Sequence, residues 1–515
     1  MSQTPSLTRN FFVAAVAIVP AQLSFATYDF TVLALQRDLG LSIDQINAVQ
    51  LMPTAAALVI VFVAGRLAQA FGSRRLIAAA AALFCLGTLL SALSTGLPTL
   101  LLGRAMEGAA GTTMSIASLA LLERSFSQHP RRGLMYGLYA AVAPAVFIIA
   151  PLLGADLATQ WSWRALPALS CGFGALALAT SLACVPAEPP SVLPMRTLSI
   201  PLLAGVVTAL IGASAMMLGV GAPLQAALAA LGTAAGIVFL TRTHMARFRL
   251  MIATGLSHLA AAWRGLIAFF LMRTIDLLFF ATLLLQYRFD VGLSETAWLM
   301  LPCQAASTAG CLLGGTAMAY WGAHRTAVGC LLATAAAALA TMPLGVGAPP
   351  WQFIASASLM GAANMAALAA LTAHVMAKPA RGAEGTMASV LNLSENAGIV
   401  LGGLVAGLVV FGTLESRLGF YLDQFTPVSL ETARAVAARV REGASLHVLG
   451  SHFDVPVDAQ LPASVEAARD FAWIDAYRAA LFLCLATNTA AAAVLWRCGS
   501  LQAAKSPALS EPGTS

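Results

Sequence analysis

Charged side chains are scarce in this sequence. Asp, Glu, Lys and Arg make up 10% of its 515 residues, whereas hydrophobic residues make up 59%. Soluble domains carry about 25% charged residues. A soluble chain as apolar as this one would expose large apolar patches to water and aggregate. The shortage of charge therefore excludes a soluble protein and predicts a polytopic membrane protein.

Signatures of catalysis and of metal binding are missing as well. None of the eight cysteines belongs to a C-x-x-C pair, so neither a zinc site nor a disulfide framework is indicated. His447 and His452 lack the spacing of metal ligands. The sequence contains no H-E-x-x-H, no G-x-S-x-G and no Walker loop. We therefore expect no enzymatic activity, no cofactor, no metal and no ATP-driven step.

What the sequence does have is a series of apolar runs near 20 residues, the length of a membrane-spanning helix. They predict an all-α fold with 14 transmembrane helices. The even number places both termini on the same side of the membrane. The expected helices lie at 11–35, 47–68, 76–95, 98–122, 134–158, 164–185, 198–219, 223–241, 263–286, 296–319, 326–345, 352–375, 386–411 and 474–496.

The basic residues predict which side that is. With the N-terminus inside, the short outer loops contain only Arg37, Arg164 and Arg288, while the basic residues of the short inner segments are far more numerous. Because inner loops of bacterial membrane proteins collect Lys and Arg, both termini are expected in the cytoplasm. The same bias accounts for the net charge of +6 without a nucleic-acid partner. The inner residues are Arg9, Arg74, Arg75, Arg124, Arg131, Arg132, Arg196, Arg242, Arg247, Arg249, Arg325, Lys378, Arg381, Arg497 and Lys505.

Segment 412–473 is the only sizeable polar stretch, and we expect it to be a periplasmic loop. Residues 429–444 begin with a Ser cap and end at a Gly, which predicts a surface helix. Residues 464–480 open in the same way and are expected to run on into the last membrane helix.

Two stretches repeat at an offset of 250 residues. GRLAQAFGSRR (65–75) aligns with GTAMAYWGAHR (315–325), and Gly72 corresponds to Gly322. The repeat predicts two parallel six-helix bundles with a two-helix insertion between them, an architecture of transporters. The expected domains are residues 1–190, the inserted helices and cytoplasmic linker in 191–250, and 251–515 with the periplasmic loop.

Several motifs resemble those of the major facilitator superfamily, specifically its fourteen-helix drug:proton antiporter branch. They are YDFTVLALQRDLGLS (28–42), GRLAQAFGSRR (65–75), GRAMEGAAG (103–111), GLYAAVAPAVFIIAPLLGA (137–155), WSWR (161–164), LLLQYRFDVGLSETAWLMLP (283–302) and GTMASVLNLSENAGIVLGG (385–403). The sequence departs from these motifs at Gln36, at Gln69, where the loop motif has an acid, and at Val146 and Ala150.

The resemblance implies multidrug efflux: proton-coupled export of amphipathic or hydrophobic small molecules across the bacterial inner membrane. It also implies a periplasmic adaptor (membrane fusion) protein and an outer-membrane channel as partners. The residues that match its gating motifs are Gly65, Gly72, Arg74, Arg75, Gly137, Pro151 and Gly154.

Three ionisable residues in the first half are embedded in apolar helices, where charge by default marks a substrate or proton path. Asp29 has no basic residue within a helical turn, so its partner must be a residue of another helix or a proton. Arg104 and Glu107 are three apart and share a helix face. One interpretation is a self-neutralised structural pair; in the other, Glu107 holds a proton and Arg104 tunes it. Asp29, Arg104 and Glu107 are the predicted proton-coupling residues.

A second polar group is predicted to line the substrate cavity. Arg273 and Asp276 are also three apart, on the helix expected at 263–286, and mutual neutralisation remains an open alternative for them. Glu395 lies in NLSENAG, with amide side chains on either side. Glutamines in membrane helices either line a cavity or join helices. The predicted cavity residues are Arg273, Asp276, Glu395, Asn392, Gln36 and Gln286.

Two rival functions are weighed against drug export. A dedicated exporter of an endogenous metabolite, such as a siderophore, would use the same fold with a more polar cavity. A membrane-embedded enzyme would need one of the catalytic motifs that are missing.

Overall fold

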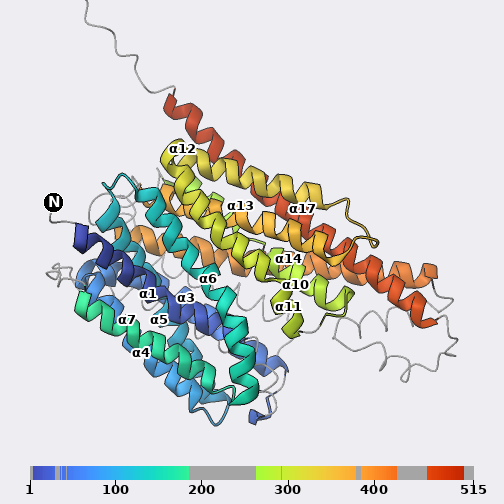
Figure 1. The fold of residues 1–515 in the computed structure, drawn as a ribbon, viewed down its shortest axis with the longest axis horizontal. Coiled ribbons are helices and arrows are strands. Elements are labelled where there is room, and N and C mark those ends of the chain that lie inside the picture. The colour runs from blue at the N-terminus through green and yellow to red at the C-terminus, as the bar shows by residue number, and fades with distance from the viewer. Residues whose placement is uncertain are drawn as a thin grey trace, which may run out of the picture. The chain divides into compact units, whose positions relative to one another are not determined.

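The structure is a computed structural model that describes residues 4–28, 35, 38–41, 43–184, 262–275, 277–291, 293–377, 384–425 and 461–503. Every regular element in these ranges is a helix (Figure 1). Nine helices there are long and apolar enough to cross a membrane, or ten if the bent pair Met52–Val61 and Val63–Phe71 is one span. The all-α membrane fold is thus confirmed for the described part of the chain. The helices expected at 198–219, 223–241 and 429–444 lie outside it, as does the proposed insertion 191–250.

The described residues cluster into two compact units. The first contains residues up to Leu266 together with Cys311–Thr326 and Leu368–Asn396. The second contains Ile267–Gly310, Ala327–Ala367 and the chain from Ala397 onward.

In the first unit, helix α5 holds the N-terminal helices together. The unit contains α1 (Thr4–Tyr28), α3 (Ile43–Phe71), α4 (Ser73–Ala92), α5 (Leu97–Phe126), α6 (Arg132–Gln160) and α7 (Ala165–Cys184). Helix α5 packs against α1, α3 and α4, while α7 packs against α1 and α4. The expected helices from 47–68 to 164–185 match α3 to α7 within about one turn at each end. Any side chain on the inner face of α5 is therefore enclosed by three neighbours.

Two glycines in the first unit support the internal repeat. Gly72, between α3 and α4, has φ 79° and ψ 156°, and Gly322 has φ 76° and ψ 157°. This backbone region is accessible essentially to glycine alone. Gly322 divides α12 (Leu301–Thr341) into two helices, which correspond to those expected at 296–319 and 326–345. The two positions aligned at an offset of 250 therefore make the same turn.

The expected continuous helix at 263–286 is wrong at its centre. Residues 262–272 are helical, Arg273 and Thr274 form a turn, Ile275 is irregular, and α10 begins afterwards (Leu277–Arg288). The N–H of Arg273 is shared between the carbonyls of Phe269 and Phe270, each at 3.1 Å. Arg273 and Asp276 therefore do not share one uninterrupted helix face, and Asp276 itself lies outside the described residues.

The cause of this break lies on another helix, α14 (Glu384–Phe425). A Cβ atom at Gly402 would lie 2.1 Å from the Cα of Thr274, and one at Gly398 would lie 2.7 Å from the Phe270 carbonyl oxygen. The two glycines, one turn apart, let the backbone of 270–274 press against α14. An irregular backbone at membrane depth is tolerated where it is buried in protein, and these glycines provide that burial.

Helices α14 and α17 (Leu461–Ala503) are much longer than a membrane is thick. They have 42 and 43 residues, or about 63–65 Å at 1.5 Å per residue, against about 30 Å for the hydrocarbon core. Residues 412–425 and 461–473 of the segment expected to be periplasmic are helical, and its location outside the membrane stays a prediction. The expected continuation of 464–480 into the last membrane helix is confirmed. Residues 426–460 lie outside the described part.

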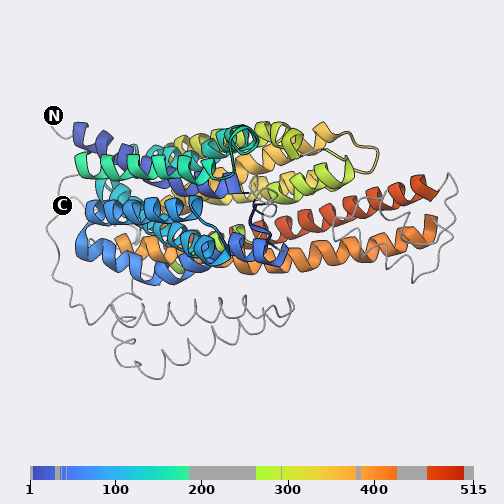
Figure 2. The same cartoon turned by 90° about the horizontal axis from the view of Figure 1, so that it is seen from below.

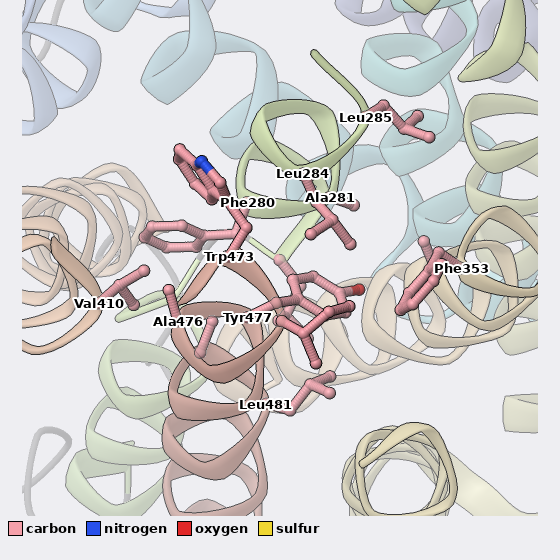
Figure 3. Close-up of a cluster of buried hydrophobic side chains, with 14 of the residues drawn as sticks. Phe280, Ala281, Leu284, Leu285, Phe353, Val410, Trp473, Ala476, Tyr477 and Leu481 are labelled. Atoms are coloured by element: carbon pink, nitrogen blue, oxygen red, sulfur yellow. The ribbon is translucent and has the colours of Figure 1, made fainter. Parts of the chain in front are cut away.

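Within the second unit, a row of buried leucines accounts for the continuation of α14 beyond residue 411. Leu414, Leu418 and Leu422 recur every four residues, are buried, and belong to one core cluster with Ala468, Ala472 and Trp473 of α17. Figure 2 shows these parts of α14 (orange) and α17 (red) running side by side. Figure 3 shows how the cluster continues towards α10 and α13 (Pro350–Met376), with Trp473, Tyr477, Phe280 and Phe353 drawn together. The remaining short helix is α11 (Leu293–Leu299).

The close approach at Gly402 gives a test in which two Gly→Ala substitutions on α14 have different expected effects on stability. Gly402→Ala should lower the thermal stability of the purified protein, since overpacking costs about 1–3 kcal/mol. Gly407→Ala, on the same helix, has only a Phe411 ring atom at 4.0 Å from the new Cβ. It should leave stability unchanged or raise it by up to about 1 kcal/mol, the helix-propensity gain. Equal effects in melting curves would contradict this account of the break.

Candidate functional site

Helix α5 carries the charged pair that the sequence singles out. Arg104 and Glu107 are both buried, with side-chain exposures of 6% and 3%, and Arg104 Nη1 lies 2.7 Å from Glu107 Oε2. The i,i+3 pairing expected from sequence is confirmed. Because α5 is enclosed by α1, α3 and α4, bulk water does not solvate either charge. Hydrogen-bond partners for both side chains therefore have to come from the protein.

Two serines from neighbouring helices complete the network. Ser24 of α1 donates to Glu107 Oε2 at 2.6 Å, and Ser91 of α4 donates to Oε1 at 2.6 Å. Arg104 Nη1 also donates to the Ser24 hydroxyl at 2.9 Å. The Ser24 hydroxyl therefore donates a hydrogen bond to Glu107 and accepts one from Arg104. Both carboxylate oxygens are satisfied, which removes most of the cost of burying the charge.

The guanidinium group of Arg104 is held from a second direction by an aromatic ring. Its central carbon lies 4.5 Å from the centroid of the Tyr28 ring, a cation–π contact. Tyr28 is the last residue of α1. Asp29 follows it directly in sequence and lies outside the described residues, as does Gln36.

At one end of the first unit, an ion pair and its hydrogen bonds connect three segments that are far apart in the sequence. The Trp163 indole N–H donates to Asp38 Oδ2 at 2.9 Å, and Arg164 forms an ion pair with the same oxygen. Arg164 also donates to the carbonyl of Ser94 at 3.0 Å. The Trp163 and Arg164 hydrogen bonds lower the pKa of Asp38 below its usual 3.8. The stabilising contact is therefore present above about pH 4 and is lost only as the pH falls through that lowered value.

The gating-motif residues of α3 and α4 lie where helices approach closely. A Cβ at Gly65 would be 2.3 Å from the Gly385 carbonyl oxygen of α14. Gln69, which stands where the resembled motif has an acid, donates to Thr386 at 2.9 Å. Arg74 donates to the Leu182 carbonyl at 2.7 Å, whereas Arg75 is exposed.

An acidic residue, Glu384, lies on the α14 side of this contact. Glu384, in the first turn of α14, lies 3.6 Å from Arg124 of α5. An acidic side chain at a helix N-terminus also interacts favourably with the helix dipole. Glu384 thus lies two residues before Thr386, the hydrogen-bond partner of Gln69 in α3.

On α6, Gly137 makes a second close helix crossing. A Cβ at Gly137 would lie 2.7 Å from Gly315 of α12. Gly154 is buried, and Pro151 lies in the same helix.

The predicted cavity residues divide between the two units. Asn392 and Glu395 belong to the first unit and Arg273 and Gln286 to the second. The buried Asn392 amide donates to the Ala388 carbonyl of its own helix at 3.1 Å. Glu395 lies near enough to the hydroxyl of Tyr139 on α6 to interact with it electrostatically.

Sequence reasoning missed several polar residues that the structure brings together. Ser24 and Ser91 give no sequence signal, because single serines are common in membrane helices and their partner is far along the chain. Glu123, at the other end of α5, accepts from Arg132 at 2.7 Å and from Tyr136 at 2.5 Å. Glu123 follows directly after the helix expected at 98–122, so the apolar run did not predict its burial. No group of three His, Cys, Asp or Glu that could hold a metal occurs among the residues described.

Comparisons with known proteins agree with this fold. The sequence model of the Major Facilitator Superfamily matches residues 14–403 of this chain. The puromycin resistance protein pur8 of Streptomyces alboniger is 34% identical over 154 residues, 29% of this chain and 30% of that protein. The multidrug resistance protein Stp of Mycobacterium tuberculosis is 28% identical over 148 residues, 29% of this chain and 28% of that protein. Each match therefore spans less than a third of the relative's length.

Among solved structures, the proton:xylose symporter XylE bound to 6-bromo-6-deoxy-D-glucose has the same fold. It matches with a TM-score of 0.58 and 14% sequence identity over 96% of both chains.

A double-mutant cycle tests whether Arg104 and Glu107 act as one unit. Arg104→Met and Glu107→Leu should each lower stability by about 3–5 kcal/mol, because each leaves one buried charge unpaired. The double variant replaces both charges by apolar groups and should lose much less than the sum. The measurement is thermal unfolding of the four purified proteins in one detergent. Additive losses would show that the two side chains are independent.

Proposed function

Because this chain belongs to the Major Facilitator Superfamily and is a transporter rather than an enzyme, we propose that it is a proton-coupled secondary exporter. Its cargo would be amphipathic or hydrophobic small molecules, and its location the bacterial inner membrane. The matched relatives named for puromycin resistance and multidrug resistance support this substrate class. The observation that carries the proposal is the buried Arg104–Glu107 network, an ionisable group held inside an apolar bundle.

A membrane transporter gains nothing from a buried carboxylate for stability alone. Replacing a buried ion pair by apolar residues is often neutral or stabilising, so the presence of this pair in the middle of α5 favours a functional role. Arg104 stays charged throughout and sets the electrostatic environment for carboxylates that bind and release a proton. We assign Asp29, Arg104 and Glu107 to the proton-coupling group. Asp29 is the first candidate carrier, since no cation lies within a turn of it in sequence.

The substrate would bind between two six-helix bundles, as in other parallel-repeat transporters. This part of the proposal includes 14 transmembrane helices, with the two helices of 191–250 between the bundles. Arg273, Asp276, Glu395, Asn392, Gln36 and Gln286 would form its polar wall. Arg273 lies at the break in this segment, and discontinuous helices form the binding sites of several transporter folds.

The inner gate would be formed by the close helix crossings of the first unit. Gly65 against Gly385 and Gly137 against Gly315 allow backbone contact that any larger side chain would prevent. The Gln69–Thr386 hydrogen bond joins α3 to α14, the Arg124–Glu384 pair joins α5 to α14, and both would hold the gate closed. Gly72, Arg74, Arg75, Pro151 and Gly154 would complete the gating motifs.

Topology follows from the asymmetry of basic residues: both termini would be cytoplasmic and the 412–473 segment periplasmic. The paired ends of α14 and α17 would then project beyond the membrane on the periplasmic side. Tyr421 and Arg417 of α14 contact Asp475 of α17, so the projection is braced. We propose that it receives a periplasmic adaptor protein that leads to an outer-membrane channel.

Proton coupling is tested directly by dye efflux. Inverted or right-side-out vesicles with the protein should move a lipophilic dye such as ethidium against its gradient when energised. A proton uncoupler should abolish that movement, and Glu107→Gln should reduce it strongly. Vesicles without the protein are the control. Efflux that persists with the uncoupler would refute proton coupling while leaving transport itself intact.

The adaptor is tested by removing the segment between the two long helices. Replacing residues 426–460 by a short Gly/Ser linker should leave dye transport in proteoliposomes unchanged, because α14 and α17 keep their packing. In cells the same variant should confer less drug resistance than the wild type at equal expression. Equal resistance in cells would contradict a role of this region in partner binding.

A further inference from the structure

A cavity lies inside the first unit, beside the Arg104–Glu107 pair and between α1, α4, α5 and α7. It offers about 30 Å³ to water-sized molecules. A buried water needs about 10–15 Å³ on this measure, so the cavity has room for about two. Its deep end is polar and is lined by Ser24, Ser91, Arg104, Glu107 and Ser170.

Two polar atoms at this deep end lack a hydrogen-bond partner among the described residues. They are Ser170 Oγ of α7 and Arg104 Nε, both fully enclosed; Ser170 is 0% exposed. Buried polar groups are nearly always satisfied by protein or by ordered water. Since both residues line a space that fits water, water is the partner the geometry calls for. Water held there lies in the same pocket as the Glu107 carboxylate.

The opposite end of the cavity is apolar. Leu35, Leu100, Trp163, Leu166 and Pro167 line it, and Leu35, Leu100 and Trp163 belong to one buried cluster. Glu107 lies ten residues along α5 from Leu97, or about 15 Å. This apolar layer therefore separates the polar end from the surface where α5 begins.

Within that apolar layer, Trp163 is the residue that is hydrogen-bonded to a group at the protein surface. Its ring is 4% exposed, and its indole N–H donates to Asp38 at 2.9 Å. The Asp38 side chain is 45% exposed and pairs with Arg164. Trp163 thus stands between the cavity and the aqueous surface. Two contacts with the surface pair orient its ring: the hydrogen bond to Asp38 and a cation–π contact with Arg164, whose central guanidinium carbon lies 4.5 Å from the ring centroid.

We propose that this cavity is the path by which protons reach Glu107 from the outer surface, with Trp163 as its gate. The inference rests on the proposed proton coupling. A hydronium ion in the cavity would transfer its proton to Glu107 Oε1 and leave water behind. Ser91, no longer needed as a donor, would turn its hydroxyl to accept the new O–H. Arg104 keeps its charge and its contacts with Ser24 and Tyr28.

This path lies within the N-terminal helices, so a proton and a bulky substrate would not compete for one route. An exporter that handles large molecules gains from this separation, because the proton site can be loaded while substrate is bound. The path also assigns a role to Ser170, which no motif marks, and to Trp163, which the WSWR stretch contains.

Silver-ion accessibility tests the path. In a variant whose eight cysteines are replaced, Ser170→Cys places a thiol in the cavity. Ser181→Cys is the matched control: it lies 11 residues further on α7, three turns away on the same face, is also 0% exposed, and does not line the cavity. Right-side-out vesicles are exposed to Ag⁺ in chloride-free buffer, and the remaining thiols are counted after denaturation. Each variant is first checked for transport.

The thiol at 170 should react with external Ag⁺ and the thiol at 181 should not. Trp163→Phe, which keeps most of the ring but loses its hydrogen bond, should speed the reaction at 170 about tenfold, equivalent to ~1.4 kcal/mol in the opening equilibrium. Asp38→Asn should act in the same direction. No reaction at 170 in any background, with uncoupler-sensitive transport intact, would overturn the path and leave the proposed function standing. Reaction at 170 unaffected by Trp163→Phe and Asp38→Asn would overturn the gate.

Discussion

Burying the carboxylate of Glu107 inside an apolar helix bundle is the constraint on which this structure depends. The charge is tolerable only because Arg104, Ser24 and Ser91 reach it from three helices. That requirement fixes how α1 and α4 sit on α5, since a shift of either helix would leave an oxygen without its donor. The position of the Glu107 carboxylate and the packing of α1 and α4 on α5 therefore depend on each other.

Glycine has the complementary role at the crossings of other helices. Gly65 and Gly137 bring backbones together in the first unit, and Gly398 and Gly402 do so in the second. These contacts are made by backbone and small side chains, without long side chains between the helices. The charged network and the glycine crossings are thus two different ways in which helices are held together in this fold.

The sequence alone predicted most of the membrane helices, because each is a long apolar run, and it predicted the Arg104–Glu107 pair from its spacing. It could not predict Ser24 and Ser91 as partners, since they lie on other helices. The break at Arg273 was missed because its cause, Gly402, is far along the chain. The helix over 464–480 was predicted from its Ser start, whereas the continuation of α14 through 412–425 was not, although the stripe of Leu414, Leu418 and Leu422 was present. The roles of Asp29, Gln36 and Asp276 stay predictions.

The central claim is that the group formed by Asp29, Arg104 and Glu107 exchanges a proton for substrate. Substrate-induced proton release from the purified, detergent-solubilised protein near neutral pH tests it most directly. The wild type should release protons when it binds ethidium, and Asp29→Asn should bind the dye without releasing them. Release that is unchanged in Asp29→Asn and in Glu107→Gln would contradict the claim and move the proton site elsewhere.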